Sequence, residues 1–339
     1  MSQTIQLRRD TAANWASVNP ILANGEMGVV LDDFSYKIGD GTTAWNALPN
    51  RELTGIFTAA MLLEAVANPS VPAAGQMRFY AHNIAGRMFP KWLGPSGLDN
   101  PVQAALWANS MVLVVPSTGS SFNILGAAAP TAVGTVTTPA PVPGVNHRTG
   151  CRRALVTSGA TANSASELRI ASGLCYRGED FSGVLQGGFF FATRFAVSST
   201  TLNQRCAVGL MNTTAAILTS QVPSALTNCI FAGWDSADAN LQIMHNDGTG
   251  ACTKIDLGAN FPANNPAAHY ELVLFCAPNG ETVGYRVTRL DTGAVATGTI
   301  STDLPTKNTM LTWHSYANNG GTAAAVVLEF MRAYLENDY

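Results

Sequence analysis

Apolar and polar residues alternate with a period of two through much of the chain beyond residue 150. In 189–197, one predicted face carries Phe189, Phe191, Thr193, Phe195 and Val197. The same period recurs in 270–276 and in 324–330, after which it shifts by one residue. Such alternation is typical of β-strands, and the shift predicts a β-bulge. Many short strands separated by turns predict a mainly β protein whose segment 101–339 is an antiparallel β-sandwich of lectin-like or jelly-roll type.

The N-terminal segment, 1–53, has a different pattern and predicts a small α+β bead. Asp10 or Thr11 can cap a short helix, which ends at Asn19-Pro20 because the residue before a proline disfavours the α region. A hairpin follows, with strands over 27–31 and 34–38. Gly39-Asp40-Gly41 then forms a tight turn, and Trp45 is expected to fold back on the hairpin.

Residues 54–100 predict a connector made of one helix and one hairpin. Thr58 can cap a helix over 59–67, where strong helix formers follow one another, and Asn68-Pro69 ends it. The hairpin pairs 77–81 with 87–92. About three turns of helix are too short to be stable alone. We therefore expect the helix to pack against symmetry-related copies of the chain.

Composition excludes several classes of partner. Charged residues make up only 12% of the 339 residues, and the formal net charge is −3. A basic phosphate-binding face is absent, so nucleic acid is not an expected partner. No apolar run reaches the roughly 18 residues of a membrane span. Met1-Ser2-Gln3-Thr4 also lacks a signal-peptide pattern, so we expect synthesis in a cytoplasm and no membrane insertion.

The six cysteines contain no C-x-x-C pair, which disfavours a zinc or redox site. We expect them to be reduced packing residues, and we expect neither a metal nor a cofactor.

The order of the N-terminal motifs closely resembles the attachment module of bacteriophage tail fibres and tropism-determinant proteins. The resemblance rests on Gln6-Leu7-Arg8-Arg9-Asp10-Thr11-Ala12-Ala13-Asn14-Trp15, Asn19-Pro20-Ile21-Leu22, Gly25-Glu26-Met27-Gly28, Tyr36-Lys37-Ile38-Gly39-Asp40-Gly41 and Ala44-Trp45-Asn46. The Asp32-Asp33-Phe34 turn departs from it by being more acidic and less glycine-rich. A weaker similarity to fibre connectors continues through 75–99, and the remaining chain is similar to the C-terminal sandwiches of such fibres.

The resemblance implies a structural virion protein without catalysis. Its bead, 1–53, would attach to other phage tail or baseplate proteins, and the chain would form a homotrimer. Its sandwich, 101–339, would present a receptor-binding surface to a glycan or protein of the host cell. Two other functions stay open: a glycan depolymerase tailspike, and a purely structural fibre or decoration protein that makes no receptor contact.

Enzymatic chemistry finds little support in the sequence. There is no Gly-x-Ser-x-Gly elbow, and the five histidines are scattered. Asp235, Asp238 and Asp247 could be the carboxylates of a glycosidase or of a calcium site, but their neighbours favour turns. Depolymerases of this kind usually need a long β-helix, and the chain has no solenoid period. We therefore expect a protein that is not an enzyme.

Aromatic residues beside amides are the strongest candidates for receptor binding. Sugar rings stack on Trp or Tyr while Asn and Asp bind their hydroxyls. The alternative is a strand end that packs at a core edge or a trimer seam. The candidate receptor-binding residues are Trp313, His314, Tyr316 and Asn318, followed by Trp234 and Asp235.

Overall fold

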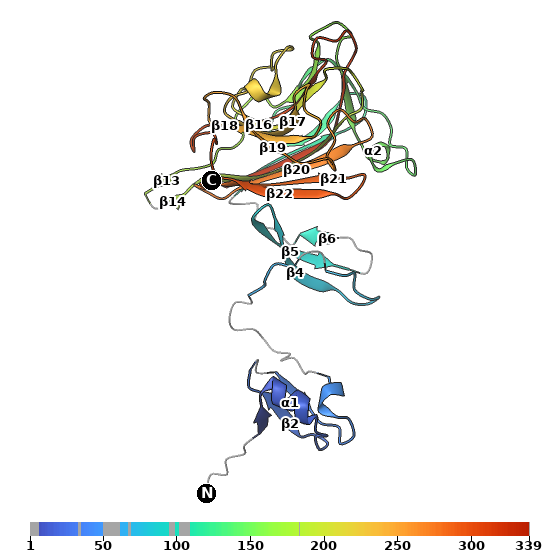
Figure 1. The fold of residues 1–339 in the computed structure, drawn as a ribbon, viewed down its shortest axis with the longest axis vertical. Helices are drawn as coiled ribbons and strands as arrows, with labels where there is room; N and C mark the ends of the chain where they lie inside the picture. Colours follow the sequence, from blue (N-terminus) through green and yellow to red (C-terminus); the bar gives the residue numbers. More distant parts are fainter. Residues whose placement is uncertain are drawn as a thin grey trace. The chain divides into compact units, whose positions relative to one another are not determined.

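The computed structural model describes residues 7–32, 35–49, 62–66, 69–94, 99–101, 109–182 and 184–338. The chain divides into two compact units, Met1–Leu62 and Leu63–Tyr339. Strands dominate the described residues, as Figure 1 shows. The predicted mainly β fold class is confirmed.

The first unit is a three-stranded sheet with one short helix. Its elements are β1 (Arg8–Asp10), α1 (Ala12–Val18), β2 (Met27–Val30), β3 (Tyr36–Ile38) and the 3-10 turn η1 (Trp45–Ala47). The hydroxyl of Thr11 caps α1 by accepting a hydrogen bond from the Asn14 N–H, and Asn19 ends the helix in the left-handed region. Strand β1, which pairs in parallel with β2, was not predicted because three polar residues show no alternation.

Two stacked tryptophans form the centre of this unit. The rings of Trp15 and Trp45 lie 4.1 Å apart between centroids. The ammonium of Lys37 on β3 lies 5.0 Å from the Trp45 ring centroid, which confirms the predicted return of Trp45 onto the hairpin. The remaining buried apolar residues of the cluster are Leu22, Val30 and Leu48. A side chain at Gly39 would lie 2.3 Å from the carbonyl oxygen of Ala23, and Gly41 has a φ of 78°. Both turn glycines are therefore needed, for different reasons.

The second unit begins with a small sheet, which we call the connector sheet. It consists of β4 (Arg78–Ile84), β5 (Arg87–Leu93) and β6 (Asp99–Pro101), all antiparallel. The predicted hairpin is confirmed, with longer strands than expected.

The predicted connector helix is wrong over 62–66, where the backbone is not helical. Residues 58–61 and 67 of that prediction lie outside the described residues. Ala65 instead pairs in parallel with Ala81, and the Val66 N–H donates to the Ala81 carbonyl oxygen over 2.9 Å. Pairing with an existing strand provides hydrogen bonds without the unfavourable nucleation of a short helix, so tertiary context overrides helix propensity here.

Two antiparallel sheets form the predicted sandwich (Figure 1). The nine-stranded sheet contains β7 (Asn109–Pro116), β8 (Phe122–Leu125), β10 (Thr135–Thr137), β11 (Ala154–Thr157), β15 (Gly187–Val197), β20 (His269–Cys276), β21 (Val283–Arg289), β22 (Val295–Ile300) and β24 (Val327–Asp338). The seven-stranded sheet contains β9 (Thr131–Val133), β12 (Ala165–Arg169), β16 (Arg205–Met211), β17 (Cys229–Trp234), β18 (Gln242–Asn246), β19 (Thr253–Asp256) and β23 (Thr312–Asn318). A two-stranded ribbon, β13 (Asp180–Phe181) and β14 (Val184–Leu185), and two short turns, α2 (His147–Gly150) and η2 (Pro223–Ala225), complete the described elements.

Strand β15 is buried on both faces. Phe189, Phe191 and Phe195 enter the core between the two sheets, as the period predicted. Phe190 lies on the opposite face in a separate apolar cluster. The predicted bulge is confirmed at Met331, because Arg194 and Phe195 pair with Arg332 and Phe330 and leave Met331 without an opposite residue.

Segment 212–228 covers the outer face of the seven-stranded sheet. Ile217 and Leu226 of this segment pack with Phe231, Met244 and Tyr316 of the sheet. This sheet is therefore buried on both faces over β16, β17 and β23. All six cysteines are unpaired, and the sulfurs of Cys229 and Cys252 lie 3.6 Å apart.

Candidate functional site

The aromatic residues that the sequence suggested for receptor binding lie on β23, inside the seven-stranded sheet. The exposed fractions are 1% for Trp313 and 0% for His314, Tyr316 and Asn318. Trp313 faces the core between the sheets, with its ring 4.7 Å from that of Phe330. These candidate receptor-binding residues are therefore not exposed on the unit, because both faces of β23 are covered.

On the outer face of β23, the polar side chains hold segment 212–228 in place. Nδ1 of His314 lies 2.8 Å from the Glu167 carboxylate, and both residues are fully buried. Burial also raises the pKa of Tyr316 to about 12. The side chains of His314, Tyr316 and Asn318 each make a hydrogen bond to a backbone carbonyl oxygen of the segment. The accepting oxygens belong to Thr213, Leu218 and Gln221, respectively. Their role is structural.

The second candidate pair also has structural contacts. Trp234 is 3% exposed, and its indole N–H donates to the Gln204 carbonyl oxygen. The carboxylates of Asp235 and Asp238 each lie 2.7 Å from the ammonium of Lys254. Burial raises the pKa of Asp235, but hydrogen bonds from Lys254 and Ser224 outweigh it and leave that pKa below its ordinary value. Asp235 is therefore held ionised within a surface ion-pair cluster.

The connector sheet docks on the outer face of the nine-stranded sheet. The guanidinium of Arg87 makes two hydrogen bonds of 2.6 and 2.8 Å to the Glu336 carboxylate, and it lies 5.1 Å from the Phe190 ring centroid. Phe89 meets Phe190 edge to face, with centroids 5.0 Å apart. A methyl group at Gly284 of β21 would lie 2.1 Å from the Ala85 carbonyl oxygen, so the hairpin tip touches the sheet directly.

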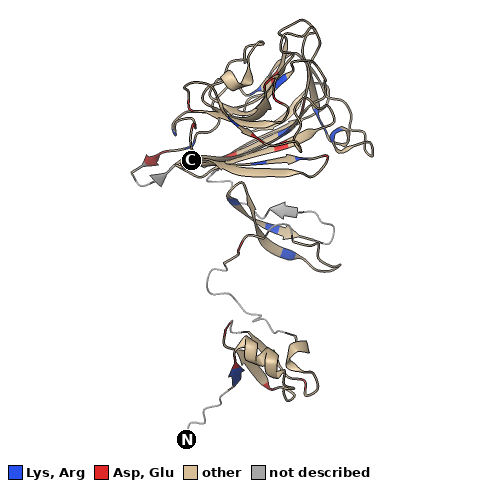
Figure 2. Cartoon of the chain, viewed as in Figure 1, with Lys and Arg blue, Asp and Glu red and all other residues tan. Residues whose placement is uncertain are grey.

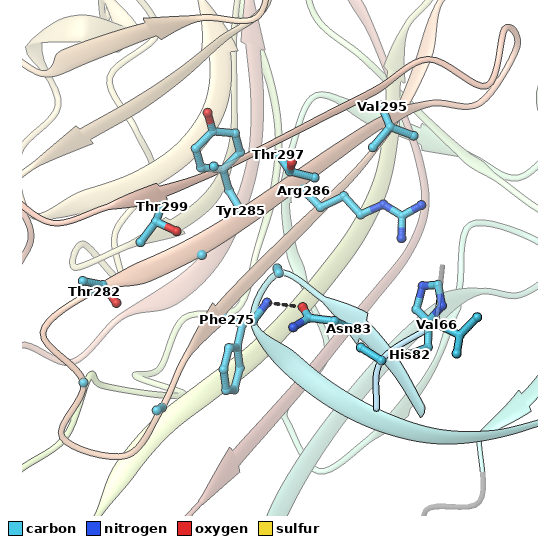
Figure 3. Close-up of a pocket in the computed structure, with 17 residues that line it drawn as sticks. Val66, His82, Asn83, Phe275, Thr282, Tyr285, Arg286, Val295, Thr297 and Thr299 are labelled. Carbon is cyan, nitrogen blue, oxygen red and sulfur yellow. Dashed lines mark hydrogen bonds between the residues drawn. The ribbon is translucent and has the colours of Figure 1, made fainter. Parts of the chain in front are cut away.

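Beside this contact lies a groove of about 820 Å³, between the connector hairpin and strands β20 to β22 (Figure 3). Residues that the figure labels on its walls are Val66, His82, Asn83, Phe275, Thr282, Tyr285, Arg286, Val295, Thr297 and Thr299. The rest of the lining consists of alanines and glycines. Its volume lies within the range of small-molecule sites. This groove is the best candidate for a binding site among the described residues.

The groove was not predicted, although the hairpin that forms one wall was. Thr297 and Thr299 alternate with smaller residues along β22, which marks only a strand with a polar face. The wall formed by His82 and Asn83 lies about two hundred positions away in the sequence from these threonines. Only the docking of the connector brings the two walls together.

Among the described residues, no group of three or more His, Cys, Asp or Glu side chains could hold a metal ion. In the same part of the chain, no helix is long and apolar enough to cross a membrane. Figure 2 shows that charged residues are thinly spread over the sandwich strands.

Comparison with known families concerns the first unit. Residues 5–43 match the family model of the major tropism determinant N-terminal domain. The chain carries a tropism-determinant-like module. The match includes β1, α1, β2 and β3 and confirms the resemblance seen in the motif order. No curated protein matches the chain.

Solved structures resemble the second unit only distantly. Lectin I from Ulex europaeus, in complex with the methyl glycoside of α-L-fucose, has a TM-score of 0.44 at 9% identity over 68% of this chain and 98% of the lectin. A protein of unknown function from Shewanella oneidensis MR-1 has a TM-score of 0.41 at 10% identity over 68% of this chain and 87% of its own. The CBM2 module of the evolved Dit of Lactobacillus casei BL23 phage J-1 has a TM-score of 0.34 at 14% identity, over 55% of this chain and 77% of that module. At these scores, the function of the sandwich has to rest on its own residues.

The tropism-determinant-like module exposes several large apolar side chains. The exposed fractions are 68% for Val18, 57% for Ile21 and 45% for Leu31. Arg8 belongs to the same unit, and its side chain is 47% exposed. Contact with another protein chain would bury such side chains.

Proposed function

We propose that the chain is a phage tail-fibre subunit that attaches to the virion through its N-terminal module and presents the β-sandwich to the host-cell surface. The observation that carries this proposal is the match of residues 5–43 to a tropism-determinant domain, on a compact unit distinct from the sandwich. In this reading, the module contacts other tail or baseplate proteins, and the second unit recognises a surface glycan or protein.

Competition with phage adsorption tests the proposal. Host cells incubated with the purified full-length chain are expected to adsorb fewer phage than cells incubated with an equal amount of an unrelated β-sandwich protein. A chain that neither binds cells nor reduces adsorption would favour the purely structural alternative. Shortened glycan in the supernatant would favour the depolymerase alternative, and we expect none because Asp235 and Asp238 are engaged by Lys254.

We also propose a homotrimer, which the exposed Val18, Ile21 and Leu31 of the module support because an oligomer would cover them. Native mass spectrometry is expected to give three times the chain mass of 35.6 kDa. As a control, Ile21→Asp should weaken the assembly while leaving the sandwich folded. A stable species of one chain mass for the unsubstituted protein would contradict this proposal.

A further inference from the structure

We propose that the groove between the connector hairpin and strands β20 to β22 binds an acidic saccharide, with Arg286 as the anchor for its carboxylate or phosphate group. This inference rests on the proposed function, because it names the class of surface molecule that the second unit would recognise.

Charge is the first observation. Of the described residues that line the groove, Arg286 is the only one with a permanent charge, and no carboxylate is among them. Arg286 lies on β21, and its side chain extends along the groove toward the wall formed by His82 and Val66 (Figure 3). A negatively charged group entering this groove would therefore meet a cation without meeting an opposing acid.

The second observation is that Arg286 lacks a partner where its neighbours have one. Its Nε atom is buried without a hydrogen-bond partner, and the described residues offer it no ion pair. On the same outer face of the sheet, Arg332 lies 3.0 Å and Arg194 2.5 Å from the Glu271 carboxylate. Because no described residue accepts a hydrogen bond from the guanidinium, a ligand that accepts from Arg286 would provide the partner that it lacks.

Hydroxyl groups are the third observation. Thr282, Thr297 and Thr299 line the same wall as Arg286, and each can both donate and accept a hydrogen bond (Figure 3). Phe275 and the surrounding glycines provide apolar surface on which a sugar ring can lie. A planar guanidinium binds carboxylate or phosphate through two parallel hydrogen bonds. A charged anchor beside neutral hydroxyls and an apolar floor matches an acidic sugar better than a peptide or a lipid.

Calorimetric titration of the full-length chain tests the proposal with three probes. These are an oligosaccharide that contains glucuronic acid, a sugar phosphate, and a neutral maltotetraose. We expect at least one acidic probe to bind more tightly than the neutral one, and binding to weaken as salt rises. The acidic probe that binds identifies whether a carboxylate or a phosphate is recognised.

Substitutions localise the site. Arg286→Ala should weaken acidic-probe binding by roughly tenfold or more, because a charge-assisted hydrogen bond is lost. Thr297→Val should weaken it several-fold. Arg332→Ala removes a more exposed arginine from the same face and should leave binding unchanged. Thermal unfolding of the Arg286→Ala chain should match that of the unsubstituted chain, since the Arg286 side chain has no hydrogen-bond or ion-pair partner to lose among the described residues.

Several results would overturn the inference. They are failure of both acidic probes to bind, equal binding of the neutral probe, or unchanged binding after Arg286→Ala. Phage adsorption separates this failure from that of the proposed function. If the unsubstituted and Arg286→Ala chains compete equally with phage, the sandwich recognises the host elsewhere. If the unsubstituted chain does not compete at all, the proposed function fails, and the titration still decides the groove.

Discussion

Replacing Trp45 with alanine is expected to unfold the tropism-determinant-like module while the β-sandwich stays folded. The module has one small apolar cluster, in which Trp45 stacks on Trp15. Truncating a buried tryptophan costs about 3–5 kcal/mol. At roughly 0.05–0.15 kcal/mol per residue, a unit of about 60 residues has a free energy of unfolding of about 3–9 kcal/mol. The loss is therefore comparable in size to the whole stability of the module.

Limited proteolysis and circular dichroism would measure this effect. Cleavage within the first 50 or so residues is expected at temperatures where the unsubstituted module resists, with the sandwich transition unchanged. Val18→Ala is the matched control, because Val18 belongs to the same unit but is 68% exposed, so its effect should stay within about 0.5 kcal/mol. Equal protease resistance of the Trp45→Ala and Val18→Ala chains would show that the stacked rings do not stabilise the module.

Replacing Glu167 with alanine is expected to destabilise the sandwich by about 3–5 kcal/mol, which is the usual cost of removing one partner from a buried ion pair. The charged partner is Arg169, whose guanidinium lies 3.5 Å from the Glu167 carboxylate. Glu167 and His314 are both fully buried, and Oε1 of Glu167 lies 2.8 Å from Nδ1 of His314. The same carboxylate also accepts from the Ile217 N–H of the covering segment. Alanine would take this carboxylate away from the Ile217 N–H, from His314 and from the Arg169 guanidinium.

Urea unfolding would give the free energy, and proteolysis within 212–228 would show whether the covering segment detaches. Glu281→Ala is the matched control, since the Glu281 side chain is 79% exposed and pairs only with Lys307 among the described residues, so we expect stability close to that of the unsubstituted chain. Glu167→Gln keeps an acceptor and should recover part of the loss. If Glu167→Ala were no more destabilising than Glu281→Ala, the buried pair would make no net contribution to stability.

Local sequence patterns determined the strands and the N-terminal module. The period of two along 189–197 and its shift near Met331 are properties of neighbouring residues, and they predicted strand β15 and the bulge correctly. The motif order of the first 46 residues predicted the module because its turns depend on the residue types at those positions, such as Gly39 and Gly41. These features need no distant partner.

Tertiary structure decided which faces are covered, and this determined the site. The period of two places Trp313 and Tyr316 on opposite faces of β23. It does not indicate that segment 212–228 buries the second of these faces. The helix predicted over 59–67 followed local propensity, which a pairing between Ala65 and Ala81 overrides. The groove at Arg286 exists because Arg87 meets Glu336, 249 positions away. Contacts between such distant residues depend on how whole sheets pack, and no local pattern records them.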